Sequence, residues 1–168
     1  MPDVRSDVAM RRSVGGRLSA PLRRTFSKGR ALLRLRPRQW AELARAWWLM
    51  LHVRKRLLKQ PFGEARVWFK ERIAAPAHSK VRPSPHRILW AVSRAAWFLP
   101  GECTCLHRAV TAKILLAQHG WAAELHIGGR HGAKGRFEAH AWLECEGRVI
   151  LGALPALDSY KRFEGFTL

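Results

Sequence analysis

Two residues, Cys105 and His140, have the types and the placement that nucleophilic catalysis needs. Cys105 follows Thr104, a residue type that caps helices, and apolar residues at helical spacing follow it. The sequence therefore predicts Cys105 in the first turn of a helix, where unpaired N–H groups and the helix dipole favour a thiolate. The thiolate is the nucleophilic form of cysteine. The alternative for Cys105 is a small buried apolar side chain, which is common for an unpaired cysteine.

His140 is the candidate base for this thiol. It stands in the sequence Ala139-His140-Ala141-Trp142, inside a run that we expect to be a strand, and its small neighbours leave room for a helix end. A nucleophile on a helix and a base on a strand form a Cys-His pair if a third group fixes the imidazole. The alternative for His140 is an ordinary strand histidine that is hydrogen-bonded within the protein.

Metal binding is the rival chemistry for these residue types. The side chains concerned are Cys103, Cys105 and His107, with His140 and Cys145 further along the chain. A structural zinc site needs two separate pairs of ligands two to four residues apart, and the sequence has no second pair. We therefore expect no metal and no other cofactor, and we interpret Cys103 and Cys145 as buried or half-buried thiols. His107 and Arg108 are expected on a solvated helix face, with contact to the substrate as the alternative.

The elements that must position these residues follow from apolar periodicity and from turn residues. Ser84 and Pro85 begin one helix, Pro100 and Gly101 end it, and Gly120 ends the helix that starts at Cys105. The expected helices cover residues 39–59, 64–74, 84–99 and 105–119, and the expected strands cover residues 122–129, 137–144 and 148–151. Helices followed by a short antiparallel meander predict an α+β domain in which a catalytic helix packs on a small sheet.

Charge divides the chain into a basic half and a more balanced half. Residues 1–60 carry 16 basic and 3 acidic residues, and residues 61–168 carry 15 and 9. We expect a basic, disordered tail over residues 1–37, with a short helix near residues 26–35. A helical extension over residues 38–80 and a catalytic domain over residues 81–168 follow, joined by a proline-containing linker at residues 75–85. No nucleic-acid-binding motif is present, so we expect no nucleic acid partner. Weak membrane association is compatible with the basic segment.

Two further features bear on the compartment and on the tryptophans. Three cysteines without a spaced framework favour a reducing environment, so we expect a cytoplasmic protein. No apolar run is long enough to cross a bilayer.

Trp40, Trp47 and Trp48 recur at helical spacing, which predicts that they pack the N-terminal helix on the domain or hold a partner protein.

Five segments of the chain form a recognisable pattern. They are Cys105-Leu106-His107-Arg108-Ala109, Leu115-Leu116, Gly120-Trp121-Ala122-Ala123-Glu124-Leu125-His126-Ile127-Gly128, Ala139-His140-Ala141-Trp142-Leu143-Glu144 and Gly147-Arg148-Val149. This pattern resembles the stand-alone leader peptidases of lasso-peptide biosynthesis, which are similar to the C-terminal domain of microcin-processing proteins. The resemblance covers residues 85–168. It implies a papain/transglutaminase-like fold with Cys105 as nucleophile and His140 as base.

The third catalytic residue is the point at which this chain departs from the family. An aspartate is expected near the strand after the histidine strand, and residues 148–152 contain no carboxylate. Asp158 is the nearest aspartate downstream and is our candidate. Glu144 is the alternative, because residues four apart on a strand share a face with His140. A backbone carbonyl, or no orienting group, also remains open.

The resemblance implies a substrate and partners. The enzyme would remove the leader from a lasso precursor peptide, a separate small protein would bind that leader, and a lasso cyclase would use the new amino terminus. Two other functions remain open. An acyl transferase of the transglutaminase type would use the same cysteine and histidine, and a non-catalytic basic binding module would need neither.

Overall fold

The computed structural model describes residues 35–75, 82–132, 135–164 and 168. The chain divides into two compact units, Met1–Arg36 and Pro37–Leu168, and the fold described here is that of the second. The helix expected near residues 26–35 and most of the expected linker lie outside the described residues.

Four α-helices and a 3-10 turn make up the helical part of the unit. In chain order they are α2 (Pro37–Lys59), α3 (Phe62–Ala74), α4 (Pro85–Ala95), η1 (Ala96–Phe98) and α5 (Cys105–Gln118). The expected helices are confirmed, with the end of the third one tightened into η1. Pro85 is the first residue of α4 as predicted, although Ser84 makes no side-chain capping bond there.

The sheet is antiparallel and small. Its strands are β1 (Glu124–His131), β2 (Phe137–Cys145), β3 (Arg148–Leu151) and β4 (Lys161–Arg162), in the spatial order β3-β2-β1-β4. The three predicted strands are confirmed, and β4 was not foreseen. The turn between β2 and β3 uses Glu146 and Gly147, both with positive φ (51° and 72°), as a tight two-residue hairpin requires.

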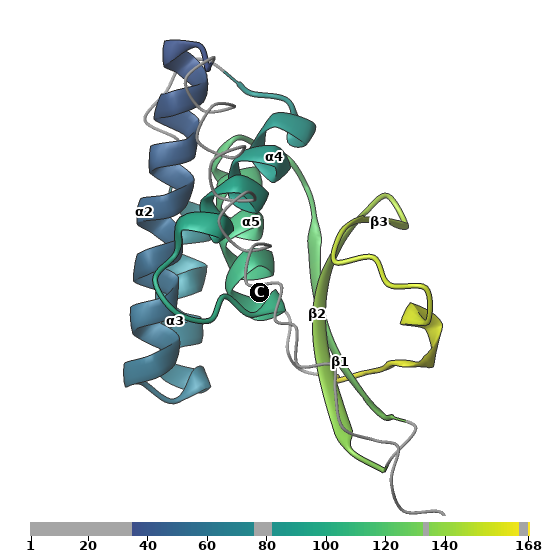
Figure 1. Ribbon diagram of the computed structural model, residues 1–168. Helices are drawn as coiled ribbons and strands as arrows, with labels where there is room; N and C mark the ends of the chain where they lie inside the picture. The colour runs from purple at the N-terminus through teal and green to yellow at the C-terminus, as the bar shows by residue number, and fades with distance from the viewer. Residues whose placement is uncertain (1–34, 76–81, 133–134, 165–167) are drawn as a thin grey trace, which may run out of the picture. The chain divides into compact units, whose positions relative to one another are not determined.

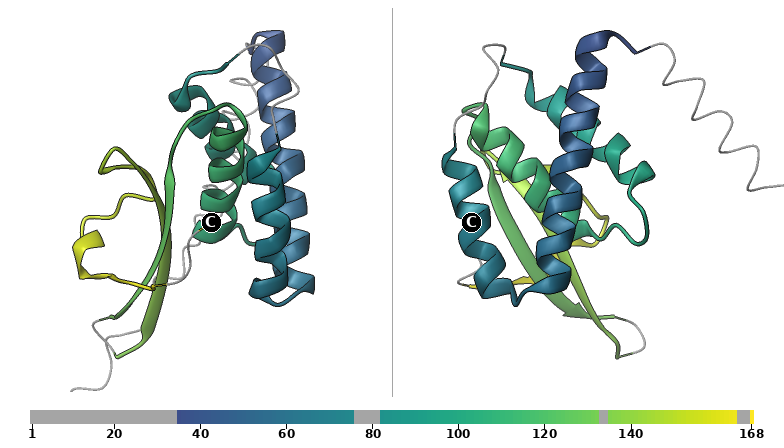
Figure 2. Two further views of the ribbon diagram at one scale, coloured as in Figure 1. Left: turned by 180° about the vertical axis from the view of Figure 1, so that it is seen from behind. Right: turned by 90° about the vertical axis from the view of Figure 1, so that its left-hand side faces the viewer.

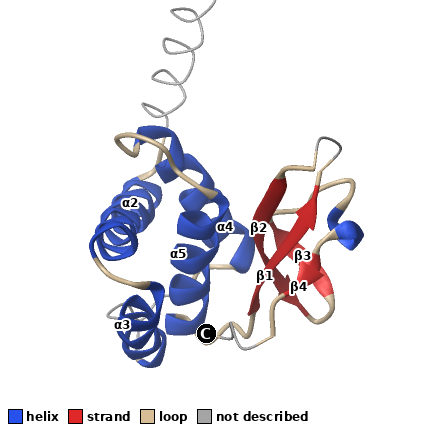
Figure 3. Ribbon diagram, turned by 90° about the horizontal axis from the view of Figure 1, so that it is seen from below, coloured by secondary structure: helices blue, strands red, loops and turns tan. Residues whose placement is uncertain are grey.

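The unit has helices on one side of the sheet and a crossing segment on the other (Figures 1 and 3). Helix α5 lies between the sheet and the other helices, with α2 on the outside, and the second view of Figure 2 shows α2 along its length. After β3 the chain crosses the far face of the sheet through η2 (Leu157–Ser159) to reach β4. This is the α+β arrangement that the sequence predicts, with the helix that begins at Cys105 packed on a small antiparallel sheet.

Apolar burial holds the layers together. The largest fully buried side chains include Met50 of α2, Phe69 of α3, Ile114 of α5 and Leu143 of β2. Each such side chain contributes about 1.5–3 kcal/mol relative to an exposed one. Helix α5 supplies more of this core than any other helix, so its position on β2 is fixed by packing.

Among the residues that the structure describes, no helix is long and apolar enough to cross a membrane.

Candidate active site

Cys105 is the first residue of α5, and its thiol is half-buried. The Thr104 hydroxyl accepts a hydrogen bond from the His107 N–H at 3.5 Å, and the Thr104 N–H donates to Nδ1 of His107 at 3.1 Å. These bonds form a capping box in which an imidazole replaces the usual Glu or Gln side chain. The predicted helix start and its threonine cap are therefore confirmed.

His107 is buried, with 7% of its surface exposed, so the expectation of a solvated face was wrong. The sequence could not show this, because the imidazole turns back to the Thr104 backbone instead of extending outward. An acceptor Nδ1 requires the proton to be on Nε2. Burial, and then the Arg54 guanidinium, lower the pKa of His107, so the neutral form is favoured. Its buried Nε2 has no hydrogen-bond partner among the described residues.

The loop before Cys105 is held by a side chain from α2. Arg54 donates hydrogen bonds to the carbonyl oxygens of Pro100 and of Glu102, the latter at 3.1 Å. Gly101, between these two residues, has a φ of 75°. The position of Cys105 therefore depends on α2 as well as on its own helix.

The other two cysteines are half-buried, as predicted. The Cys103 thiol donates to Sδ of Met50 at 3.6 Å, and the Cys145 thiol donates to the Ala122 carbonyl at 3.0 Å. Burial raises the pKa of Cys103, although Arg108 and Arg54 act in the opposite direction. Cys103 is therefore held as a thiol, which makes it a poorer nucleophile at neutral pH.

The imidazole of His140 is fixed by a backbone carbonyl. Its Nε2 lies 2.8 Å from the oxygen of Gly152, just after β3. A carbonyl only accepts, so Nε2 carries the proton and Nδ1 is free to act as the base. The Trp142 ring stacks at 6.2 Å from the imidazole, and the Tyr160 ring lies at 5.7 Å.

Asp158 is an exposed residue of η2. Within the described part of the chain, no hydrogen bond joins its carboxylate to His140, whereas Tyr160, two residues later, contacts that imidazole. The orienting role of Asp158 stays a prediction, and Gly152 occupies the position on Nε2 that such a residue would need.

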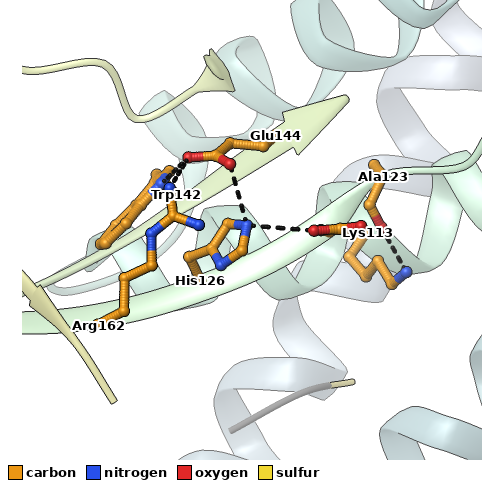
Figure 4. A network of polar contacts seen from close by, with 7 residues as sticks. Lys113, Ala123, His126, Trp142, Glu144 and Arg162 are labelled. Carbon is orange, nitrogen blue, oxygen red and sulfur yellow. Dashed lines mark hydrogen bonds and ion pairs between the residues drawn. The ribbon is translucent and has the colours of Figure 1, made fainter. Parts of the chain in front are cut away.

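Glu144, the alternative orienting residue, is engaged elsewhere (Figure 4). It accepts hydrogen bonds from Trp142 Nε1 at 2.9 Å and from Arg162 at 2.7 Å, and its other oxygen lies 3.2 Å from Nε2 of His126. Burial raises the pKa of Glu144, but the Trp142 bond and the charges of His126 and Arg162 outweigh it and lower that pKa. Glu144 therefore organises this face of the sheet.

The same figure shows how α5 is joined to the sheet on its other side. Nζ of Lys113 donates to the carbonyl of Ala123, just before β1, at 2.5 Å. This bond and the apolar packing of α5 on β2 fix the helix relative to the strand that carries His140.

Cys105 lies on α5 and His140 on β2, and these two elements pack together. In the described part of the chain no hydrogen bond or other polar contact joins the two side chains. His140, Trp142 and Glu144 alternate along β2 and so share one face. Contacts from Gly152 and Tyr160 place that face under the crossing segment, opposite the helices. The Cys105-His140 pair therefore stays a prediction.

No metal site is formed by the described side chains, because no three His, Cys, Asp or Glu residues among them lie close enough to hold an ion.

Comparison with known protein families matches most of the chain to a family model. The model of the family described as transglutaminase-like superfamily matches residues 47–164. No match was found among the curated proteins or among the solved structures. The matched region begins inside α2, so the family unit includes part of the helical extension as well as the sheet.

Proposed function

Because the chain belongs to the transglutaminase-like superfamily, we propose that it is a cysteine peptidase that removes the leader from a lasso precursor peptide. The observation that carries the proposal is the position of Cys105, a half-buried thiol at the first residue of a capped helix. That position supplies amide donors and a positive helix end to a thiolate. The lasso substrate itself rests on the sequence resemblance.

The reaction is amide hydrolysis in two steps. The Cys105 thiolate attacks the scissile carbonyl carbon, the C–N bond breaks, and protonated His140 gives its Nδ1 proton to the leaving amine. Nδ1 of neutral His140 then removes a proton from water, which attacks the thioester and releases the leader carboxylate and the thiolate. No cofactor or redox partner is needed for this balance.

The amides of the first turn of α5 would hold the oxyanion. Those of Thr104, His107 and Arg108 already donate to Nδ1 of His107, the Thr104 hydroxyl and the Thr104 carbonyl. The N–H groups of Cys105 and Leu106 make no such bond in the described structure, and they are the donors that we assign to this role.

The proposal requires His140 to approach Cys105. Catalytic hydrogen bonds are often long in unliganded enzymes and tighten with substrate. Residues 152–160 cover the imidazole on the face of β2 opposite the helices, so we propose that substrate binding rearranges both this segment and β2 at His140, which brings the imidazole to the Cys105 side. Cross-linking measures that approach directly.

For this test His140→Cys is made in a Cys103→Ser, Cys145→Ser background, and the protein is treated with a short bifunctional thiol reagent, with and without precursor peptide. We expect a link between positions 105 and 140 when precursor is present. Ala139→Cys is the matched control, because the side chain at position 139 projects from the face of β2 opposite that of His140. A link from position 139 and none from position 140 would contradict the assignment of His140 as base.

Activity is tested with a synthetic lasso-type precursor and mass spectrometry. Hydrolysis gives a leader with a free carboxylate, whereas an acyl transferase gives a leader amide when a primary amine is added. Cys105→Ala should abolish turnover, and Cys103→Ala and Cys145→Ala should retain it. If Cys105→Ala leaves all measurable processing unchanged, the chain is a binding module and not a peptidase.

The partners follow from the same proposal. A separate leader-binding protein would present the precursor, and a lasso cyclase would consume the new amino terminus. The measurement is the rate of precursor cleavage with and without a candidate leader-binding protein. An increase in rate that disappears when the leader is scrambled supports this arrangement.

A further inference from the structure

Helix α2 carries a row of apolar side chains on its outer side. Trp40, Ala44, Trp48, Leu51 and Leu58 follow one another at steps of three, four and seven residues, so they lie along one line of the helix. Trp40 is 44% exposed, Trp48 63% and Leu58 69%. The buried residues of α2 are Leu43, Ala46, Met50 and Val53. The row is therefore separate from the core contact, and we call its five residues the α2 stripe.

The α2 stripe lies in strongly basic surroundings. Helix α2 has six basic residues and one acidic residue. Lys55, in line with the stripe, and Lys59, beside Leu58, are both exposed. The single acid, Glu42, forms an ion pair with Arg87 of α4 at 2.7 Å, so its charge is compensated within the protein.

Further exposed aromatic side chains adjoin the stripe on η1. Nε1 of Trp47 donates to the Phe98 carbonyl at 3.1 Å, which fixes η1 beside α2. Trp97 is 49% and Phe98 43% exposed. The Arg94 guanidinium lies 4.2 Å from the Trp97 ring, so this extension is again aromatic and cationic.

We propose that the α2 stripe binds the surface of an anionic phospholipid bilayer. Tryptophan is enriched in the headgroup region, because its ring is apolar and its N–H is polar, and lysine can lay its stem along apolar surface while its ammonium reaches a phosphate. Two indoles separated by one small alanine on an outer helix suit a flat surface, and the cations complement its charge. This inference is independent of the proposed peptidase activity.

An acidic protein would complement the basic residues of α2 but not the α2 stripe. Between Trp40 and Leu51 the stripe itself holds only apolar side chains, and the basic residues lie beside it. The expected orientation places α2 parallel to the membrane plane.

The experiment is sedimentation of the full chain with vesicles of phosphatidylcholine alone or of phosphatidylcholine with phosphatidylglycerol, at low and high salt. We expect binding to the anionic vesicles that weakens with salt. Trp40→Ser with Trp48→Ser should weaken binding by about tenfold or more, since two interfacial indoles are lost. Phe137→Ser is the matched control, because Phe137 is 59% exposed on the sheet and far in sequence from α2.

Three outcomes overturn the proposal. Unchanged binding by the double tryptophan variant, with its fold intact by circular dichroism, would place the lipid contact elsewhere, including the basic residues before α2. If the unaltered chain does not bind vesicles, and the double tryptophan variant has a lower sedimentation coefficient than the unaltered chain, the stripe serves self-association. Lys55→Glu with Lys59→Glu separates charge from apolar contact, and an unchanged affinity for anionic vesicles would also contradict the proposal.

Discussion

Replacement of His107 by leucine tests whether the imidazole cap sets the start of the catalytic helix. His107→Leu keeps an apolar volume but removes the acceptor that Nδ1 offers to the Thr104 N–H. A lost cap costs about 0.5–2 kcal/mol, and an unpaired buried N–H costs about 1–3 kcal/mol. The variant also removes the buried, unpartnered Nε2–H, which offsets part of this loss. We expect a net loss of about 1–2 kcal/mol in the free energy of unfolding at pH 8.

The pH dependence of the free energy of unfolding tests the same role of His107. The folded-state pKa of His107 is lowered, chiefly by burial and then by Arg54, so the unfolded chain binds the extra proton more readily. The stability that neutral His107 contributes is present above its unfolded pKa of about 6.5 and is lost as pH falls toward the folded pKa. Urea unfolding from pH 8 to pH 5 measures this loss.

The matched control is His107→Gln, because glutamine is the usual acceptor of a capping box and does not titrate in this range. Its stability at pH 8 should be within about 0.5 kcal/mol of the original chain, and its pH slope should be shallower. The difference between the two proteins is the quantity to compare, because contributions that both proteins share cancel in it. Equal slopes for both, or a His107→Leu variant as stable as the original at pH 8, would refute the reasoning. Alkylation of Cys105 reports the consequence, and His107→Leu should slow it.

Three further predictions concern the sheet. Gly152→Ala should lower the free energy of unfolding, measured in urea, by about 2–3 kcal/mol. The φ angle of Gly152 is 81°, and a Cβ there would lie 2.8 Å from the Ala141 carbonyl oxygen. A change below about 0.5 kcal/mol would contradict this prediction. Glu144→Gln should lower the free energy of unfolding at neutral pH and make its decrease in acid less steep. The lowered pKa of Glu144 contributes stability that disappears as pH falls through that pKa. An acid transition that does not change in this variant would count against the Glu144 network. Asp158→Asn should lower turnover by about a hundredfold or more if Asp158 orients His140, as the sequence predicts, and a change within about twofold would leave the Gly152 carbonyl as the orienting group.

Local structure was predictable because short-range chemistry decides it. Thr104 before an apolar helical pattern gives the start of α5, and Glu146-Gly147 gives the hairpin between β2 and β3. The apolar period of α2 gives its length almost to the residue. Each of these signals lies within a few residues of the feature that it controls.

Strand β4 was missed for the opposite reason. It has two residues, and its pairing with Gly128 and Gly129 of β1 joins segments more than thirty residues apart. Two residues carry no period, so no pattern in the sequence marks them as a strand. Only the path of residues 152–160 across the sheet brings them to that edge.

The sequence by itself determined the residue types of the candidate site, the helix that begins at Cys105 and the strand that carries His140. Tertiary structure decided which groups those side chains meet. Gly152 bonds His140, Glu144 bonds Trp142 and Arg162, and His107 is buried against Thr104. The first kind of information is fixed by periodicity and capping within one element. The second depends on packing between elements, and a carbonyl that any residue possesses leaves no trace in the sequence.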